Sequence, residues 1–366
     1  MKHLLMGTLL TLAIVLAGCA DHALTPTSEP AAEPSEKLSV HQVDPFAILS
    51  GRSVNIDGAT AGHRAKVATF GFIQGLEAAP NGDIIVADLA AGIGSRNRGI
   101  EIALPGVTDI GPIGRGTMWA TTGPVGDGED CVAGETTFLD CGQAIYRATK
   151  GKNRLIANLF AFEETYNPDG AGIDSNPYDV QSLRGRAALV ADAAGNDLLR
   201  VNNRGRVDVL AVFPPGDPVP IAPGVEIRPE AVPTSVAIGP GGHYYVGELT
   251  GFPAPLGTSS IWKVAPSASW ANCGSNSDCV KVFDGGFTSI IDLAFGADGT
   301  LYVAEFDEES WLAAPSAAGG TINACDLDAG TCTEVATGIP FLTAITIGKR
   351  GTLWATANFA TRVVQP

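Results

Sequence analysis

The chain has 366 residues, of which 45 are glycine and 24 are proline, and its formal net charge is −16 at pH 7. The negative charge argues against a nucleic-acid partner, because neutralising phosphates requires clustered Lys and Arg, and it fits a cationic ligand or simple solubility better. The Gly and Pro content, with no long segment of 3.6-residue apolar period, indicates a chain of short strands and turns.

The first residues indicate export. Lys2 and His3 precede an apolar run from Leu4 to Leu16, which is too short to cross a bilayer comfortably and has the form of a signal peptide. The run ends in Leu-Ala-Gly-Cys at Cys19, which resembles the lipobox of bacterial lipoproteins; an ordinary signal peptide with a chance Cys is the alternative. We expect a lipoprotein signal peptide at 1–18, a lipidated Cys19 with a flexible tether over 19–60, and a membrane-anchored, extracytoplasmic protein of the periplasm or cell surface.

One pattern recurs along residues 61–366. Two stretches that alternate apolar and polar residues flank a Gly-rich turn, which predicts a tight β-hairpin. The pattern occurs at Leu76–Asp88, Thr108–Thr122, Tyr178–Asp192, Thr234–Glu248, Ile290–Glu305 and Thr343–Ala357. Repeats of this kind indicate a ring of small sheets. The sequence therefore predicts an all-β fold, a six-bladed β-propeller.

The two ends of the repeat region complement each other. The last hairpin is followed only by Thr361–Gln365, so its blade lacks an outer strand, whereas Arg64–Phe70 has the pattern of a strand without a hairpin of its own. An N-terminal strand that completes the last blade would leave no open sheet edge. The sequence thus predicts contact between the two ends of the chain.

The remaining strands follow each hairpin. The first blade has a short third strand near Gly99–Leu104 and little sequence for a fourth, so we expect it to be incomplete or tightly connected. In blades whose strands run up and down, the long connections fall on one face of the disc, and they are Ala90–Arg98, Gly123–Gly142, Phe160–Asn176, Pro214–Pro233, Leu249–Ser259 and Phe306–Gly319. Long loops are where function concentrates, so this loop-rich face is the predicted binding surface.

The cysteines other than Cys19 fall into three pairs that are close in sequence. They are Cys131 with Cys141, Cys273 with Cys279, and Cys325 with Cys332. Local pairs of this kind are typical of disulfides in an oxidising compartment. A zinc site is excluded by spacing, because no CxxC occurs and His is scarce.

Carboxylates recur at two equivalent positions of the hairpins. The start of the inner strand carries Gly75, Asp109, Asp179, Ser235, Asp292 and Ala344, and the end of the second strand carries Asp88, Thr122, Asp192, Glu248, Glu305 and Ala357. Both rows are expected at a channel mouth on the loop-rich face, where clustered carboxylates require a compensating cation, hydrogen bonds or solvent. Calcium is the candidate cofactor, with Asp109, Asp179 and Asp292 as its ligands. The alternative is structural: such acids also bond backbone amides of neighbouring loops.

Histidine and aromatic residues bear on the kind of site. Of five histidines, only His63 and His243 lie outside the signal and tether, so no Ser-His or Cys-His arrangement can be assembled on the loop-rich face. The long loops supply Phe160, Phe162, Tyr166, Tyr178, Phe252 and Trp311. Such a rim suits a planar apolar ligand or a partner protein, although a single ring of this kind more often holds its own loop in place.

Several stretches resemble the ScyD/ScyE family of secreted, NHL-like bacterial β-propellers. They are Asn176–Val180, Val190–Val201, Val232–Pro253 with its VGELTGFP, and Phe287–Glu305. The resemblance implies a propeller outside the cytoplasm, in a family whose founding members are associated with building a dimeric aromatic pigment. It supplies no catalytic residue to transfer, because a fold family indicates architecture more than activity.

Two functions follow as expectations. The first is a non-enzymatic module that binds a small molecule or an extracytoplasmic protein through Asp109, Asp179, Ser235, Asp292, Asp192, Glu248, Glu305, Tyr178 and Phe252. The second is a calcium-dependent hydrolase of the six-bladed lactonase type, which the inner-strand acids would serve. Nucleic acid is not expected as a partner, and the membrane is reached through the N-terminal lipid.

Overall fold

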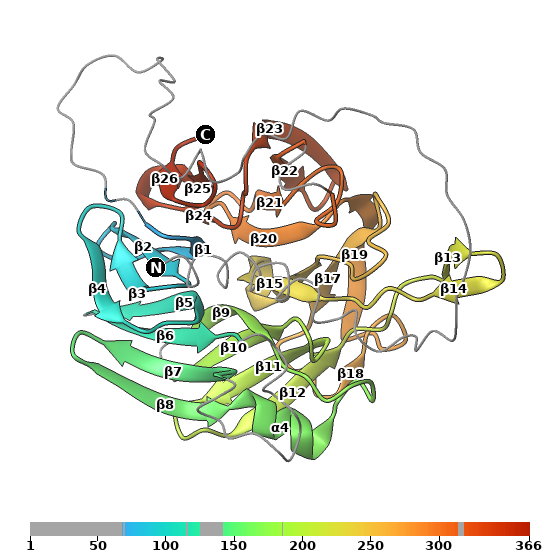
Figure 1. Cartoon of the computed structure of the whole chain (residues 1–366), viewed down its shortest axis with the longest axis horizontal. Helices are drawn as coiled ribbons and strands as arrows, with labels where there is room; N and C mark the ends of the chain where they lie inside the picture. The colour runs from blue at the N-terminus through green and yellow to red at the C-terminus, as the bar shows by residue number, and fades with distance from the viewer. Residues whose placement is uncertain (1–67, 69, 115, 125–141, 185, 314–317) are drawn as a thin grey trace, which may run out of the picture. The chain divides into compact units, whose positions relative to one another are not determined.

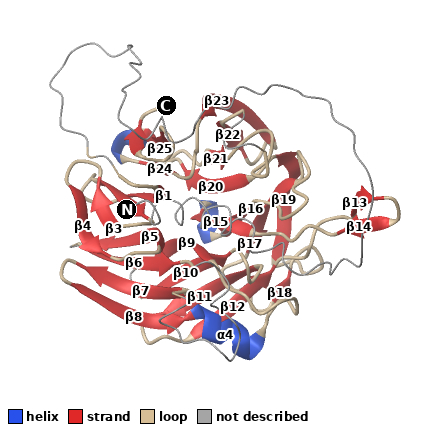
Figure 2. Cartoon of the chain, viewed as in Figure 1, coloured by secondary structure: helices blue, strands red, loops and turns tan. Residues whose placement is uncertain are grey.

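The computed structural model describes residues 68–366 apart from 69, 115, 125–141, 185 and 314–317, and all of these belong to one compact unit. The signal peptide, Cys19, the tether and the Cys131–Cys141 pair lie outside the described residues. Six antiparallel sheets form a ring, with one strand of each next to the central axis (Figure 1). Almost all of the regular structure is strand (Figure 2). The six-bladed propeller predicted from the sequence is confirmed.

The first three blades contain four consecutive strands each. Their strands are β1 (Ile73–Ala78), β2 (Ile84–Asp88), β3 (Gly92–Ser95) and β4 (Gly99–Ala103); β5 (Val107–Gly114), β6 (Thr117–Thr122), β7 (Ala144–Thr149) and β8 (Lys152–Asn158); and β9 (Pro177–Leu183), β10 (Ala187–Asp192), β11 (Asp197–Asn202) and β12 (Val207–Val212). A short helix, α4 (Leu159–Tyr166), leads from the second blade to the third. Asn158 caps this helix, because its side chain accepts from the backbone N–H of Ala161.

The other three blades follow the same order. Their strands are β15 (Pro233–Ile238), β16 (Tyr244–Glu248), β17 (Ser259–Val264) and β19 (Cys279–Phe287); β20 (Ile290–Phe295), β21 (Leu301–Glu305), β22 (Gly320–Asp326) and β23 (Thr331–Ile339); and β24 (Ile345–Ile347), β25 (Leu353–Ala357) and β26 (Arg362–Val364). Two inner hairpins turn through single 3-10 turns, Pro240–Gly242 and Lys349–Gly351. A separate two-stranded hairpin, β13 (Val219–Ala222) and β14 (Val225–Ile227), projects from the ring between blades three and four (Figure 1).

The first blade differs from its predicted form. It is complete, and the segment expected to be its third strand is the fourth, β4. The third strand is the short β3, which begins only three residues after β2 ends, so the connection Ala90–Arg98 is not a long loop. Gly92 permits this tight packing, because a Cβ there would lie 2.2 Å from the Ile102 carbonyl oxygen.

Closure of the ring is visible in hydrogen bonds between the first and last blades. The Thr343 hydroxyl donates to the Ile73 carbonyl (2.6 Å), and the Ile73 N–H donates to the Ala360 carbonyl (2.7 Å). Most of the expected closing strand lies outside the described residues, but the Phe70 N–H donates to the Thr361 carbonyl (3.2 Å). The predicted contact between the two ends of the chain is confirmed.

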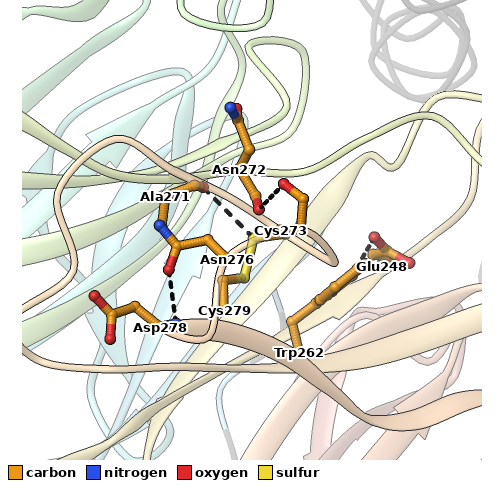
Figure 3. The surroundings of a disulfide bond; sticks show 9 residues. Glu248, Trp262, Ala271, Asn272, Cys273, Asn276, Asp278 and Cys279 are labelled. Atoms are coloured by element: carbon orange, nitrogen blue, oxygen red, sulfur yellow. Dashed lines mark hydrogen bonds between the residues drawn. A yellow bond between two sulfur atoms is a disulfide. The ribbon is translucent and has the colours of Figure 1, made fainter.

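Two of the three predicted disulfides lie in the described part of the chain, and both are formed. Cys325 and Cys332 face each other in the β22–β23 hairpin. Cys273 and Cys279 close the excursion between β17 and β19 (Figure 3). That excursion contains β18 (Ala271–Asn272), which pairs in parallel with β12 and so joins blade four to the outer edge of blade three. In the described residues no helix is long and apolar enough to span a membrane.

Candidate functional site: the acidic channel

The inner strands of all six blades line a central cavity of about 220 Å³. Its lining includes carboxyl groups from four different blades: Glu77 on β1, Asp109 on β5, Asp179 on β9 and Asp292 on β20. No Lys, Arg or His is among the described residues of this lining. We refer to these four residues as the channel acids.

A bulge in each of five inner strands places these side chains. The pairing register with the second strand shifts between Ile73 and Gly75, Val107 and Asp109, Pro177 and Asp179, Pro233 and Ser235, and Ile290 and Asp292. A bulge inserts one residue and redirects the side chains around it. As a result, two consecutive side chains can both reach the next blade, as in blade two, where Thr108 donates to the Pro177 carbonyl (2.6 Å) beside Asp109.

Three of the channel acids connect neighbouring blades through the backbone. Asp109 accepts from the Val180 N–H (3.0 Å), Asp179 from the Val236 N–H (2.6 Å) and Asp292 from the Ile345 N–H (2.7 Å). Each bond joins one inner strand to the inner strand of the following blade. These acids therefore have a structural role as well as lining the cavity.

The proton affinity of the channel acids is high. Burial, followed by the charge of Asp179, raises the pKa of Glu77 from 4.5 to about 8. Burial and Asp179 also raise the pKa of Asp109 and of Asp292 well above the usual range. The pKa of Asp179 is raised by burial but lowered by its hydrogen bond with Asp109. Carboxyl groups this close disfavour joint ionisation, and a nearby cation would favour their charged forms.

The cavity is more accessible from the hairpin-turn end than from the loop-rich end. Each long inner strand is buried at its start and partly or fully exposed at its last residues, such as Ala78, Ile238 and Phe295. At the loop-rich end Tyr178 is only 4% exposed and packs in a core cluster with Phe306 and Phe341. The geometry thus differs from the expected arrangement, in which both acid rows face one channel mouth on the loop-rich face.

The second row of acids anchors loops. Asp192 accepts from the Asn176 N–H (2.6 Å), the Gly195 N–H (3.1 Å) and the Ser175 hydroxyl. Glu305 accepts from the Thr288 N–H and from the Asn323 amide (2.8 Å). Asp88 likewise accepts from Gly71, Ala90 and Ala91 N–H groups.

Glu248 differs from the other acids of this row because, among the hydrogen bonds described, it accepts from a side chain and from no backbone N–H. Its carboxylate accepts from the Trp262 indole N–H, next to the Cys273–Cys279 disulfide (Figure 3). Burial raises the pKa of Glu248 to about 8, although the indole lowers it. Glu248 thus holds the ring against which the disulfide excursion packs.

The other predicted site residues are dispersed. Ser235 is fully buried, and its hydroxyl has no hydrogen-bond partner among the described residues. Phe252 is 38% exposed on the loop between β16 and β17. Trp311 is buried, and its indole N–H donates to the Thr250 carbonyl (2.9 Å), so it fixes two loops to each other.

Residues 68–366, outside the gaps named above, contain no group of three or more His, Cys, Asp or Glu side chains gathered so that they could hold a metal ion. Calcium at Asp109, Asp179 and Asp292 therefore stays a prediction, to be decided by binding measurements.

Sequence reasoning missed three polar residues of the channel: Glu77, Gln74 and Gln181. Glu77 lies two positions after Gly75, and residues i and i+2 of a strand face the same side, so the period-2 pattern could have found it. Gln181 donates from its amide to the Glu77 carboxylate. Gln74 is buried beside Tyr178.

Comparisons with known proteins assign this chain to no family. No family model matches the chain, and no curated protein matches it. Among solved structures, virginiamycin B lyase from Staphylococcus aureus is 16% identical and covers 78% of each chain, with a TM-score of 0.46.

Two sugar dehydrogenase structures are similarly distant. A putative glucose dehydrogenase from Thermus thermophilus is 14% identical over 80% of this chain and 93% of its own, with a TM-score of 0.47. The PQQ-bound aldose sugar dehydrogenase of Streptomyces coelicolor is 14% identical over 80% and 91%, with a TM-score of 0.46. These neighbours are β-propeller proteins, and no residue or activity is transferred from them.

Proposed function

We propose that this protein is an extracytoplasmic, lipid-anchored binding propeller that holds a small organic cation in its central channel. The observation that carries the proposal is the convergence of four carboxyl groups from four blades on one cavity without a basic residue among its described lining. The site thus moves from the loop-rich rim, where the sequence indicated it, to the channel.

The electrostatics of the channel explain why a cation is the favoured ligand. Burying several carboxyl groups together raises their pKa values, as it does for Glu77, Asp109 and Asp292. A bound ammonium or guanidinium group offers opposite charge and several N–H donors, so it favours the ionised form of each carboxyl that it touches. The volume of about 220 Å³ suits a small ligand.

The setting of the protein outside the cytoplasm rests on separate observations. The disulfides Cys273–Cys279 and Cys325–Cys332 fit an oxidising compartment. The lipobox-like segment at Cys19 supports a lipid anchor, and the resemblance to the secreted ScyD/ScyE propellers supports export.

A calcium-dependent hydrolase is the second candidate. It is favoured by the same observation, because hard cations such as calcium take carboxylate oxygens. The two candidates differ in the cation that the channel takes and in whether Asp109, Asp179 and Asp292 become its ligands.

The test is calorimetric titration of the purified protein with matched probes, with chelator present. The probes are 1,4-diaminobutane, a dication, and 1,4-butanediol, a neutral molecule of similar length. We expect the diamine to bind, the diol not to bind, and the double variant Glu77→Gln, Asp179→Asn to weaken diamine binding by at least about tenfold, since one lost charged contact is worth that much or more. Equal heats for diamine and diol, or an unchanged affinity in the double variant, would refute the proposal. In a parallel titration with calcium, after the chelator has been removed, calcium binding that the double variant abolishes, without diamine binding, would instead favour the hydrolase.

A further inference from the structure

A second group of acids lies away from the channel, at the loop-rich end of blade three. Glu163 comes from α4, Asp192 ends β10 and Asp197 begins β11. Asp192 and Asp197 are opposite each other in the β10–β11 pairing, so their side chains share one face of the sheet. A Cβ added at Gly195 would lie 3.5 Å from both Asp192 Oδ1 and Glu163 Oε2, which places these two carboxylates at the same turn. We call Glu163, Asp192 and Asp197 the α4 acids.

The α4 acids are not equally satisfied. Asp192 accepts the hydrogen bonds described above, whereas neither carboxylate oxygen of Asp197 has a hydrogen-bond partner among the described residues. Glu163 Oε1 is likewise without a partner there. Asp197 is only 1% exposed and Glu163 only 2%. Burying a carboxyl group without a hydrogen-bond donor is costly in free energy, so these oxygens require a partner. A bound ion is one such partner.

The surroundings add negative charge. Burial, followed by the charges of Asp192, Asp169 and Asp174, raises the pKa of Glu163 from 4.5 to about 9, and Asp169 and Asp174 lie in the loop after α4. For Asp197, too, every neighbouring charge that acts on its pKa is a carboxylate. A cation is therefore the missing partner that the charge of this region favours.

We propose that Glu163 and Asp197 bind one calcium ion between α4 and the β10–β11 turn. Calcium takes oxygen ligands from carboxylates, amide and backbone carbonyls, and water, and it tolerates irregular geometry. Because no three acids are gathered to hold a metal in the described part of the chain, the two carboxylates act with neutral oxygens. One candidate is Asn167, the residue that ends α4, whose buried Oδ1 has no partner in the described structure.

A groove lies next to residues that neighbour the site. A groove of about 730 Å³ between blades three and four includes Asp169 and Asn196 in its lining. Asn196 precedes Asp197, and its side-chain amide donates to Asp169 Oδ2 (2.9 Å). Once bound, the calcium ion fixes α4 and the loop after it, residues 159–176, to blade three.

The experiment compares calcium responses of matched variants of the whole protein after chelation. Wild type should bind one calcium per chain at this site by calorimetry, and its Tm should rise by several degrees when free calcium is about 100 times Kd. Asp197→Asn should weaken calcium binding at least about 100-fold and abolish the rise in Tm. Its calcium-free Tm should equal or exceed that of calcium-free wild type, because the substitution removes a buried charge. Magnesium should raise the Tm much less, since it demands a regular octahedral shell.

Two controls separate this site from the channel and from general effects. Asp179→Asn alters a channel acid and should leave the calcium response intact, as should Asp298→Asn on an exposed hairpin turn. If Asp197→Asn fails to fold, Glu163→Gln takes its place with the same expectation. An unchanged wild-type Tm in calcium, or a full response in both α4 variants, would overturn the proposal. Loss of the response in Asp179→Asn alone would move the ion to the channel.

Discussion

Replacing Glu77 by Gln tests the electrostatics of the channel directly. The substitution keeps the shape of the side chain and an oxygen that can accept a hydrogen bond from Gln181, but it removes the carboxyl group that titrates. In the folded protein burial, with Asp179, raises the pKa of Glu77 from 4.5 to about 8. Below pH 4.5 both folded and unfolded states hold this proton. As the pH rises from 4.5 to 8 only the unfolded state releases it, so the stability of the wild type falls across this window.

The size of the effect follows from the shift in proton affinity. A pKa of about 8 in place of 4.5 corresponds to about 5 kcal/mol at 1.36 kcal/mol per tenfold change in proton affinity. Glu77 is partly exposed to the channel, so screening by water reduces this to about 2 to 3 kcal/mol. Glu77→Gln should therefore match the wild type at pH 4 and exceed its unfolding free energy by about that amount at pH 9.

Urea unfolding at pH 4, 6, 7 and 9, with chelator and no amine in the buffer, measures the difference. Glu334→Gln, on the exposed strand β23, is the matched control, and we expect it to follow the wild type at every pH. A stability difference between Glu77→Gln and wild type that is the same at pH 4 and pH 9, or that favours the wild type at pH 9, would show that Glu77 is not held in its protonated form.

Three further substitutions test the packing around the channel and the loops. Gly75→Ala should lower stability by about 1 to 3 kcal/mol in urea unfolding, because its Cβ would lie 2.1 Å from Asp109 Oδ1 and force a shift in the inner ring; an unaffected midpoint would mean that Asp109 moves freely. Trp311→Ala should lower the free energy of unfolding by about 3 to 5 kcal/mol, whereas Phe252→Ala, on the neighbouring loop, should change it by about 0.5 kcal/mol or less, because only the tryptophan is buried. Similar losses for both variants would contradict this assignment. Cys325→Ser with Cys332→Ser should lower stability by about 2 kcal/mol, as expected for a disulfide that closes so short a loop, and a thiol titration should show two fewer cysteines in disulfides.

The architecture could be predicted from the sequence because each hairpin is specified by residues that are close together in the chain. Period-2 patterning and a Gly-rich turn specify each pair of inner strands within about fifteen residues, as in Ile290–Glu305, and six copies specify a ring. The third strand of the first blade was misplaced because Gly92–Ser95 has only one large apolar side chain, Ile93, and so lacks an alternating pattern. α4 was read as loop because eight residues between two strands are too few to show a helical period.

The sites required information that a single sequence does not contain. Equivalent positions placed Asp109, Asp179 and Asp292 in one row, and the structure brings them to one cavity. Which end of the cavity is exposed depends on how Tyr178, Phe306 and Phe341 pack across blades, and no local pattern encodes that. The α4 acids are similarly hidden, because Glu163 and Asp197 are separated by 34 positions and meet only when the helix folds over the β10–β11 turn.

The bulges in the inner strands explain how the residues that hold the ring together could also bind the proposed ligand. The neighbouring side chains of Thr108 and Asp109 both point toward the next blade. The Thr108 hydroxyl donates to a backbone carbonyl there, and the Asp109 carboxylate accepts from a backbone N–H. In each of the three aspartates that link blades, Oδ2 accepts from a backbone N–H on the inner strand of the following blade. Among the hydrogen bonds described, Oδ1 accepts no backbone N–H from that inner strand. A ligand that bonds to Oδ1 therefore need not break these backbone links between blades. Binding and closure then reinforce each other, because a cation that stabilises the ionised aspartates also strengthens the hydrogen bonds that these carboxylates accept from the backbone.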